Sequence, residues 1–228
     1  MLTRNNTGTK GKWLQKNGYE FSGLFYRTED GTNCRMTLDF KEKDCGLTNP
    51  DLMVIMMNPG SSHPEPAIKS YPAISNEIFF PTHPDPTQWR VVDFMQKHKY
   101  YYARVINLSD LCNPASCSLK KDAIQKHSLF LKWDRKYLKK YFQHETDILL
   151  AWGAKKIFHY IAHEALSFAI TNLGSNNKVY GAIKESDDLV FYHPLYKRKK
   201  HGWLNNVKQL DRRKLLTGLS TRQQSRTI

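Results

Sequence analysis

The chain has 228 residues, of which 40% are hydrophobic and 12% aromatic, which suffices for one α/β domain with a substantial core and excludes an intrinsically disordered protein. The formal net charge of +14 predicts a polyanionic partner, most often nucleic acid, with a generally basic protein that lacks such a partner as the alternative. Because no apolar run approaches the ~18 residues of a membrane span and the polar, basic start lacks a secretory signal, we expect a cytoplasmic protein without a membrane partner.

The first part of the chain predicts an arm followed by a β-hairpin. Residues 1–17 hold Gly, Thr, Asn and Lys with little apolar content, so we expect a mobile N-terminal arm. Segments of alternating polarity at residues 19–27 and 34–40 flank the pair Asp30-Gly31, and Asp-Gly is a strong signal for a hairpin turn.

A short apolar run at residues 52–57 predicts the central strand. It contains the β-branched Val54 and Ile55, is too short for most helices and fits a strand buried on both faces. The run ends in the turn-forming sequence N-P-G-S-S of residues 58–62. Open α/β sheets bind ligands beyond the carboxyl ends of such strands, and a core strand with an ordinary loop is the alternative interpretation.

Apolar runs and helical patterns then alternate along the chain. Residues 58–88 form a long segment rich in Pro, Ser and His, which we expect to be ordered because it contains large apolar residues. Further strands are predicted at 103–108, 147–152 and 189–192, and helices at 88–99, 118–142, 154–173 and 203–216. This pattern predicts a three-layer α/β/α domain over residues 18–216, with a central, mostly parallel four-stranded sheet plus the hairpin, and a frayed tail at residues 217–228.

The four cysteines do not form a recognisable metal-binding pattern. Their spacings match no C-x-x-C pair and no zinc-finger motif. We interpret them as reduced thiols and predict neither a metal nor a cofactor, with an iron–sulfur cluster held by all four as the disfavoured alternative. The four residues are Cys34, Cys45, Cys112 and Cys117.

Three of the predicted strands end in side chains suited to binding and catalysis: Asn58, Asn107 and His193. Taken singly, an Asn after a strand is more often a turn former, and a His before a Pro is usually solvated. In a parallel sheet, however, all three lie at one edge and converge on one pocket. Two amides and an imidazole can position a water molecule, read a planar amide edge and stabilise developing charge.

Short motifs around these residues resemble those of the uracil-DNA glycosylase superfamily. The sequence M-N-P-G-S-S of residues 57–62 is similar to the first motif of its mismatch-specific thymine/uracil branch, and V-I-N-L of residues 105–108 to its strand ending in a base-reading Asn. Residues 148–154, I-L-L-A-W-G-A, resemble its strand-to-helix step, and H-P-L of residues 193–195 its final His-Pro motif. The resemblance covers about residues 50–210 and implies the fold and chemistry of that superfamily.

Together with D-P-T of residues 85–87, the same motifs are also similar to an uncharacterised bacterial and phage offshoot, and some glycosylases of this general kind act in defence against phage. The best-known uracil enzymes carry an Asp where this chain has Asn58. Their final motif reads H-P-S-P, and this chain has H-P-L-Y at residues 193–196. These departures predict a substrate other than uracil.

Catalytic roles are expected for Asn58, His193 and Asp85. Cleavage of an N-glycosidic bond builds positive charge on the sugar and negative charge on the base. Asn58 is expected to orient the attacking water through its side-chain carbonyl, and His193 to donate a hydrogen bond to the departing base. Asp85, held between two prolines, is the preferred general base, with Glu77 and Glu65 as alternatives.

Substrate binding is expected from five further residues. Asn107 would pair with the edge of the base, and Phe79 or Phe80 would stack on its face. Gly60 and Ser61 belong to the first motif and would line the pocket. The base must first leave the duplex, at a cost of a few kcal/mol.

The loop of residues 195–201, L-Y-K-R-K-K-H, is expected to bind DNA. Leu195 or Tyr196 would fill the gap that the base leaves. A solvated basic loop is the alternative, and the basic residues 120–140 are interpreted as the outer face of a helix. The residues expected to contact the flanking phosphates are Lys197, Arg198, Lys199 and Lys200.

We therefore predict a monomeric, monofunctional DNA glycosylase that acts on double-stranded DNA, removes a modified base and leaves an abasic site. The leading candidate base is a hydroxymethylated or glucosylated cytosine of phage DNA, which implies a role in antiviral defence. The alternatives are a catalytically silent protein that binds DNA or senses a modified base, an ordinary uracil or mismatch repair glycosylase, and an enzyme of free nucleosides. The high positive charge argues against the last of these.

Overall fold

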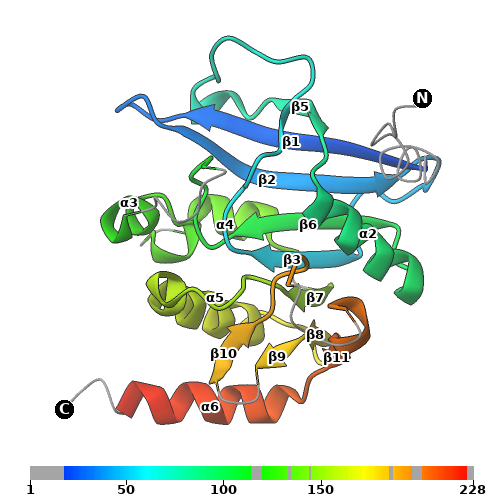
Figure 1. Ribbon diagram of the computed structural model, residues 1–228, viewed down its shortest axis with the longest axis vertical. Coiled ribbons are helices and arrows are strands. Elements are labelled where there is room, and N and C mark those ends of the chain that lie inside the picture. The colour runs from blue at the N-terminus through cyan, green and yellow to red at the C-terminus, as the bar shows by residue number, and fades with distance from the viewer. Residues whose placement is uncertain are drawn as a thin grey trace, which may run out of the picture.

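The central feature of the computed structural model is a mixed sheet of nine strands, in the order β11-β8-β7-β3-β6-β2-β1-β5-β4 (Figure 1). The structure describes residues 18–113, 120–132, 135–143, 145–184, 187–196 and 202–224, and the arm expected at residues 1–17 lies outside them. In chain order, the strands of this sheet are β1 (Tyr19–Arg27), β2 (Asn33–Glu42), β3 (Leu52–Met56), β4 (His63–Pro64), β5 (Phe79–His83), β6 (Tyr102–Asn107), β7 (Asp147–Leu150), β8 (Val179–Gly181) and β11 (Lys208–Gln209).

The prediction of a central, mostly parallel four-stranded sheet is wrong, because the main sheet is mixed and has nine strands. Four adjacent strands, β8-β7-β3-β6, do run parallel in the middle of the sheet. Antiparallel strands extend it on both sides: β2 pairs with β6, β1 with β2 and β5, β4 with β5, and β11 with β8. Apolar patterning identifies buried strands, but it does not encode which free edge a hairpin joins, and this is why the full sheet was not predicted.

The strand expected at residues 189–192 forms outside the main sheet. It is β10 (Asp187–Phe191), which pairs with β9 (Ile183–Lys184) in a two-stranded sheet, while β8 takes the parallel position beside β7. The backbone N–H of Gly153 donates a hydrogen bond of 2.7 Å to the carbonyl oxygen of Phe191. The chain after β10 is therefore tied to the segment that follows β7, at the carboxyl ends of the parallel strands.

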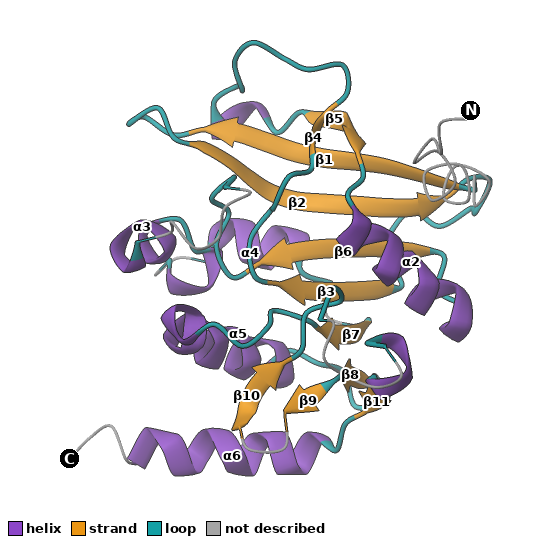
Figure 2. Ribbon diagram, in the orientation of Figure 1, coloured by secondary structure: helices purple, strands orange, loops and turns teal. Residues whose placement is uncertain are grey.

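Helices cover both faces of the main sheet (Figure 2). One face packs against α2 (Pro86–His98), whose buried residues include Trp89, Val92 and Phe94. The other face packs against α3 (Lys121–Lys126), α4 (Lys136–Tyr141) and α5 (His159–Thr171), and α6 (Arg212–Gln224) packs against α5. Short 3-10 turns lie between these elements: η1 (Ile74–Asn76), η3 (Leu129–Leu131), η4 (Lys156–Phe158) and η5 (Leu204–Asn206).

A β-bulge in the hairpin changes the direction of the side chains along β2. The ladder between β1 and β2 pairs Phe25 with Arg35 and skips Met36, which is the extra residue. Met36 joins the core cluster on the α5 face, whereas Arg35 lines the same cavity as Leu38, which packs on the α2 face. Bulges often re-aim a side chain in this way, and here the side chain is a charged one.

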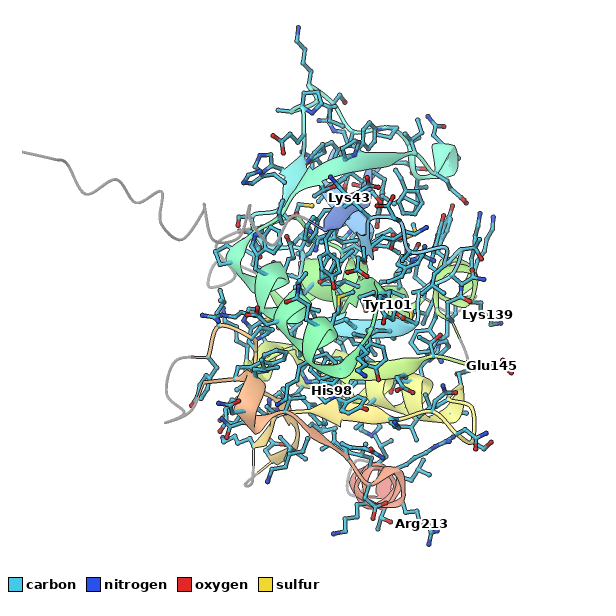
Figure 3. All side chains as sticks on the ribbon, turned by 90° about the vertical axis from the view of Figure 1, so that its right-hand side faces the viewer. Lys43, His98, Tyr101, Lys139, Glu145 and Arg213 are labelled. Carbon is cyan, nitrogen blue, oxygen red and sulfur yellow. The ribbon has the colours of Figure 1, made fainter. Side chains whose placement is uncertain are left out.

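Basic side chains occupy the outer surfaces of the helices. Figure 3 shows Lys139 of α4 and Arg213 of α6 projecting away from the ribbon. The single helix expected at residues 118–142 is instead α3, η3 and α4, and α6 extends to Gln224, beyond its expected end. None of the helices in the described ranges has the length and apolar character needed to cross a membrane.

Candidate functional site

A cavity of about 220 Å³ lies beyond the carboxyl end of β3, beside the first turn of α2. Apolar lining comes from three adjacent strands, through Leu38, Met56 and Val105. Polar lining comes from distant parts of the chain, so the sheet brings together groups that the sequence separates. These polar residues include Arg35, Asn58, Ser61, Asp85, Gln88 and His193.

The side chain of Asn58 is held in one orientation by the backbone. Its Nδ2 donates a hydrogen bond of 2.8 Å to the carbonyl oxygen of Asn113. Its Oδ1 has no hydrogen-bond partner within the described part of the chain. The oxygen is therefore available to accept a hydrogen bond from a water molecule or a ligand in the cavity.

Asp85 is the N-cap of α2 and contributes one carboxylate oxygen to the cap. Its Oδ1 accepts hydrogen bonds from the backbone N–H groups of Thr87 at 2.8 Å and Gln88 at 3.2 Å. Its own N–H donates to Oε1 of Gln88 at 2.6 Å, which completes a capping box. The cap does not use Oδ2, which lies 3.2 Å from the position that a Cβ on Gly60 would occupy. Gly60 has φ +69°, and the missing side chain lets the turn after β3 approach the carboxylate.

His193 lies in a tight turn after β10 that fixes its tautomer. The N–H of Tyr196 donates to the His193 carbonyl at 2.8 Å, and the N–H of Leu195 donates to Nδ1 at 3.3 Å. Because a backbone N–H can only donate, Nδ1 is the unprotonated nitrogen and the proton is on Nε2. Burial lowers the pKa of His193 to about 4, and nearby Asp85 acts in the opposite direction. Near pH 7 the imidazole is thus a neutral N–H donor.

Arg35 is the residue of this cavity that sequence reasoning missed. It is 2% exposed, and its Nε and Nη1 have no hydrogen-bond partner among the described residues. Burial lowers the pKa of the guanidinium, although Cys112, Asp85 and Asp110 act in the opposite direction. A single arginine within an apolar part of β2 was the available signal. It is equally typical of a solvent-facing strand position, and the bulge that turns it inward is not readable from the sequence.

Three residues expected to contact a base do not line this cavity. Asn107, the last residue of β6, is fully buried, and neither Oδ1 nor Nδ2 has a partner in the described ranges. Phe79 and Phe80 lie in β5 and pair with Leu24 and Gly23 of β1, on the antiparallel side of the sheet. Phe79 lines a separate cleft. The base contacts predicted for these residues remain predictions without support from their position.

Leu195 connects the cavity with a neighbouring groove of about 410 Å³, because it lines both. Its side chain is 43% exposed, which is high for a large apolar residue. Tyr196 lines the groove, and its ring stacks on Tyr192 with ring centres 4.2 Å apart. Arg90 lies in the same groove. Outside the described residues lie the four predicted phosphate contacts, Lys197, Arg198, Lys199 and Lys200.

The cavity combines two hydrogen-bond acceptors, one neutral donor and one buried cation. Asn58 Oδ1 and Asp85 Oδ2 are suited to holding a water molecule and taking its proton. His193 Nε2–H is suited to donating to a departing group. In the described ranges, no group of three His, Cys, Asp or Glu side chains is placed to hold a metal ion, and the three cysteines there are free thiols.

Comparison with known proteins identifies a family but no activity. A family model described as a protein of unknown function (DUF1643) matches residues 79–195, half of the chain. No curated protein and no solved structure matches. The expected membership in the uracil-DNA glycosylase superfamily is therefore wrong, because the matching family is a different one. The resemblance rested on short Asn-Pro, Trp-Gly and His-Pro motifs, whose turn-forming residues are common at strand ends of α/β proteins in general.

Proposed function

The chain belongs to the DUF1643 family of proteins of unknown function, and we propose that it hydrolyses the N-glycosidic bond of a base turned out of double-stranded DNA. The observation that carries this proposal is the shared cavity of Asn58, Asp85 and His193. Two of these offer acceptors with no other partner in the described ranges, and the third offers a neutral donor. Such a set can act on both sides of one bond, on the attacking water and on the leaving base.

The reaction requires charge to be handled on two centres. As the bond between C1′ and the base nitrogen breaks, its electron pair moves to the base and positive charge develops on the sugar. Asn58 Oδ1 orients the water, and the Asp85 carboxylate offsets the sugar charge and accepts the water proton. His193 Nε2–H donates to the base as its negative charge grows. The products are a free base and an abasic site.

The size of the cavity bears on the substrate. Its volume of about 220 Å³ lies below the ~300–1,000 Å³ typical of pockets for drug-sized ligands. It therefore suits a single base, and a sugar substituent on that base would extend through the mouth. Within this proposal, a hydroxymethylated or glucosylated cytosine of phage DNA remains the substrate to test first, with antiviral defence as the corresponding role.

Two features support DNA as the partner: the positive charge of the chain and an exposed apolar residue beside the cavity. The net charge of +14 favours association with a polyanion. Leu195 is exposed at the junction of cavity and groove, where an apolar side chain can occupy the space of an extruded base. We propose that the protein acts as a monomer in the cytoplasm, where free thiols stay reduced.

Mass spectrometry of released bases tests this function directly. Duplexes carrying uracil, a thymine mismatch, hydroxymethylcytosine or glucosyl-hydroxymethylcytosine are incubated with the protein and then heated in alkali. Release of a base together with strand breaks at the same position supports the proposal. Binding of these duplexes without release of any base would overturn it and favour a catalytically silent DNA-binding protein. Release only from free nucleosides would also contradict it.

A further inference from the structure

Arg35 lines the cavity with a buried guanidinium that is not fully hydrogen-bonded within the described part of the chain. Its side chain is 2% exposed, and Nε and Nη1 have no hydrogen-bond partner among the described residues. Burying a charged group without a partner is strongly unfavourable, and an unsatisfied buried polar group calls for an explanation. A ligand that enters the cavity is the explanation that fits a side chain already lining it.

The acidic groups near Arg35 do not neutralise it. Burial raises the pKa of the Asp110 carboxyl to about 8, so it is protonated near pH 7, and it accepts a 2.9 Å hydrogen bond from Tyr26. Burial also raises the pKa of the Cys112 thiol to about 12, which keeps it neutral. Asp85 makes no ion pair with Arg35, and one of its oxygens is held in the helix cap. Asp85 therefore acts on Arg35 through its charge alone, and no hydrogen-bonded ion pair among the described residues holds the guanidinium.

The other donor in the cavity cannot supply a positive charge. His193 is neutral near pH 7 because burial lowers its pKa to about 4. Among the described residues that line the cavity, Arg35 is the one arginine or lysine. A guanidinium also presents parallel N–H groups that match two adjacent acceptors of a planar ligand. A small planar anion satisfies both the charge and the geometry.

We propose that Arg35 is the anion-binding residue of this cavity and that its ligand is a planar, anionic heterocycle. Resting on the proposed function, this ligand is the departing base: the electron pair of the broken C1′–N bond makes the base an anion, and Arg35 binds it. Water supplies the hydroxyl that joins C1′, and its remaining proton passes through Asp85 to the base or to solvent. Arg35 thereby selects bases that leave readily as anions and present two neighbouring acceptors.

Calorimetric titration with two pyrimidines of nearly equal size tests the proposal without any catalytic step. Barbiturate is an anion at neutral pH, whereas uracil is neutral. Wild-type protein is expected to bind barbiturate about tenfold more tightly than uracil, or better, as a hydrogen bond to a charged group predicts. Arg35→Met is expected to abolish the preference. Arg35→Lys is expected to keep part of it, because lysine retains the positive charge but lacks the parallel N–H groups of the guanidinium.

The matched control is Arg90→Met, which removes an arginine of the neighbouring groove that is not among the cavity residues and should keep the full preference. Equal binding of the two pyrimidines by the wild type would overturn the proposal, as would a preference that survives in Arg35→Met or disappears in Arg90→Met. If Arg35→Met does not fold, an Arg35→Lys variant with an unchanged preference overturns it. An Arg35-dependent preference with no base released from any duplex would leave the anion site standing and refute only the proposed function.

Discussion

The backbone N–H of Leu195 donates a hydrogen bond of 3.3 Å to Nδ1 of His193, two residues before it in the same turn. The bond assigns the imidazole proton to Nε2 and leaves that group as the donor of a residue that lines the cavity. A neutral, half-buried imidazole in this state donates a hydrogen bond at every pH above its lowered pKa of about 4. This places a fixed donor where the proposed reaction develops negative charge.

Removing that donor should slow base release with little effect on DNA binding. For His193→Ala we expect base release to fall by about 10²- to 10³-fold, as for the loss of one preorganised donor. Single-turnover release measured at saturating protein reports this step separately from affinity. His63→Ala, which changes an exposed histidine outside the cavity, is the control. Wild-type release by His193→Ala would remove this residue from the mechanism.

Two substitutions of Asp85 separate its role in the helix cap from its proposed role as a base. Asp85→Ala removes both and should lower the free energy of unfolding by about 0.5–2 kcal/mol. Asp85→Ser keeps an N-cap oxygen, so its stability should stay near that of the wild type, yet base release should fall by about 10²-fold or more. Denaturant titrations and release rates on the same samples provide both readouts. Full activity in Asp85→Ser would show that the carboxylate serves only the cap.

Arg35→Met should make the protein more stable while it removes the anion site. Replacing uncompensated or poorly compensated buried charge with an apolar side chain is often stabilising by about 1–4 kcal/mol. Arg104 provides a matched comparison, because it is also largely buried but donates to both carboxylate oxygens of Asp39, at 2.8 and 2.7 Å. Arg104→Met leaves that buried carboxylate without a cation, with the Tyr102 hydroxyl still donating to it, and should destabilise by about 3–5 kcal/mol.

Chemical denaturation of Arg35→Met and Arg104→Met measures the change in unfolding free energy that each substitution causes. Opposite signs of the stability change support the view that Arg35 is held for a ligand, since function and not folding then explains its presence. Destabilisation of Arg35→Met to the same extent as Arg104→Met would mean that the fold itself compensates the Arg35 charge.

The sequence predicts the strands that carry the site better than it predicts how they assemble. The run at residues 52–57 is continuous and apolar because β3 is buried on both faces, and the run at 103–108 is apolar except for Arg104 and Asn107. Both strands, β3 and β6, occur close to their expected bounds. Asn58, Asp85 and His193 were likewise recognisable as polar residues next to turn-forming ones, and all three line one cavity. Local turn chemistry and burial are encoded in neighbouring residues, which is why these features can be read.

The features that were missed depend on contacts between distant segments. The pairing of β2 with β6, which makes the sheet nine-stranded, involves residues more than sixty positions apart, such as Leu38 and Val105. The bulge at Met36 lies in the pairing of β1 with β2 and turns Arg35 into a cavity that is closed by residues far away in the sequence, such as Asp85 and His193. Phe79 was expected to stack on the base as an aromatic residue of the long segment 58–88, but pairing with β1 places it in the antiparallel part of the sheet, away from the cavity.

Leu195 should matter for duplex DNA and not for single strands. We expect Leu195→Ala to reduce base release from duplexes by about tenfold, because an apolar wedge offsets part of the few kcal/mol that extrusion costs. Release from a single-stranded oligonucleotide should be unchanged, since no stacked pair has to open. Leu216→Ala is a suitable control, because that side chain lies on α6 and is also 43% exposed. Equal losses on both substrates would assign Leu195 to the cavity wall instead.

The lowered pKa of His193 predicts a specific dependence of stability on pH. Its pKa is about 4 in the folded protein against an ordinary value of 6.5. Between these values the unfolded chain binds a proton that the folded protein does not, so the contribution of His193 is complete above pH 6.5 and is lost as the pH falls towards 4. The stability difference between wild type and His193→Gln should therefore decrease by about 3 kcal/mol from pH 7 to pH 4.

Burial also raises the pKa of Asp110 to about 8, which lowers stability as the pH rises. This effect is common to both proteins and cancels in the difference. A flat difference for His193→Gln would show that the imidazole is as readily protonated in the folded protein as in the unfolded chain, and the neutral donor on which the mechanism depends would be lost.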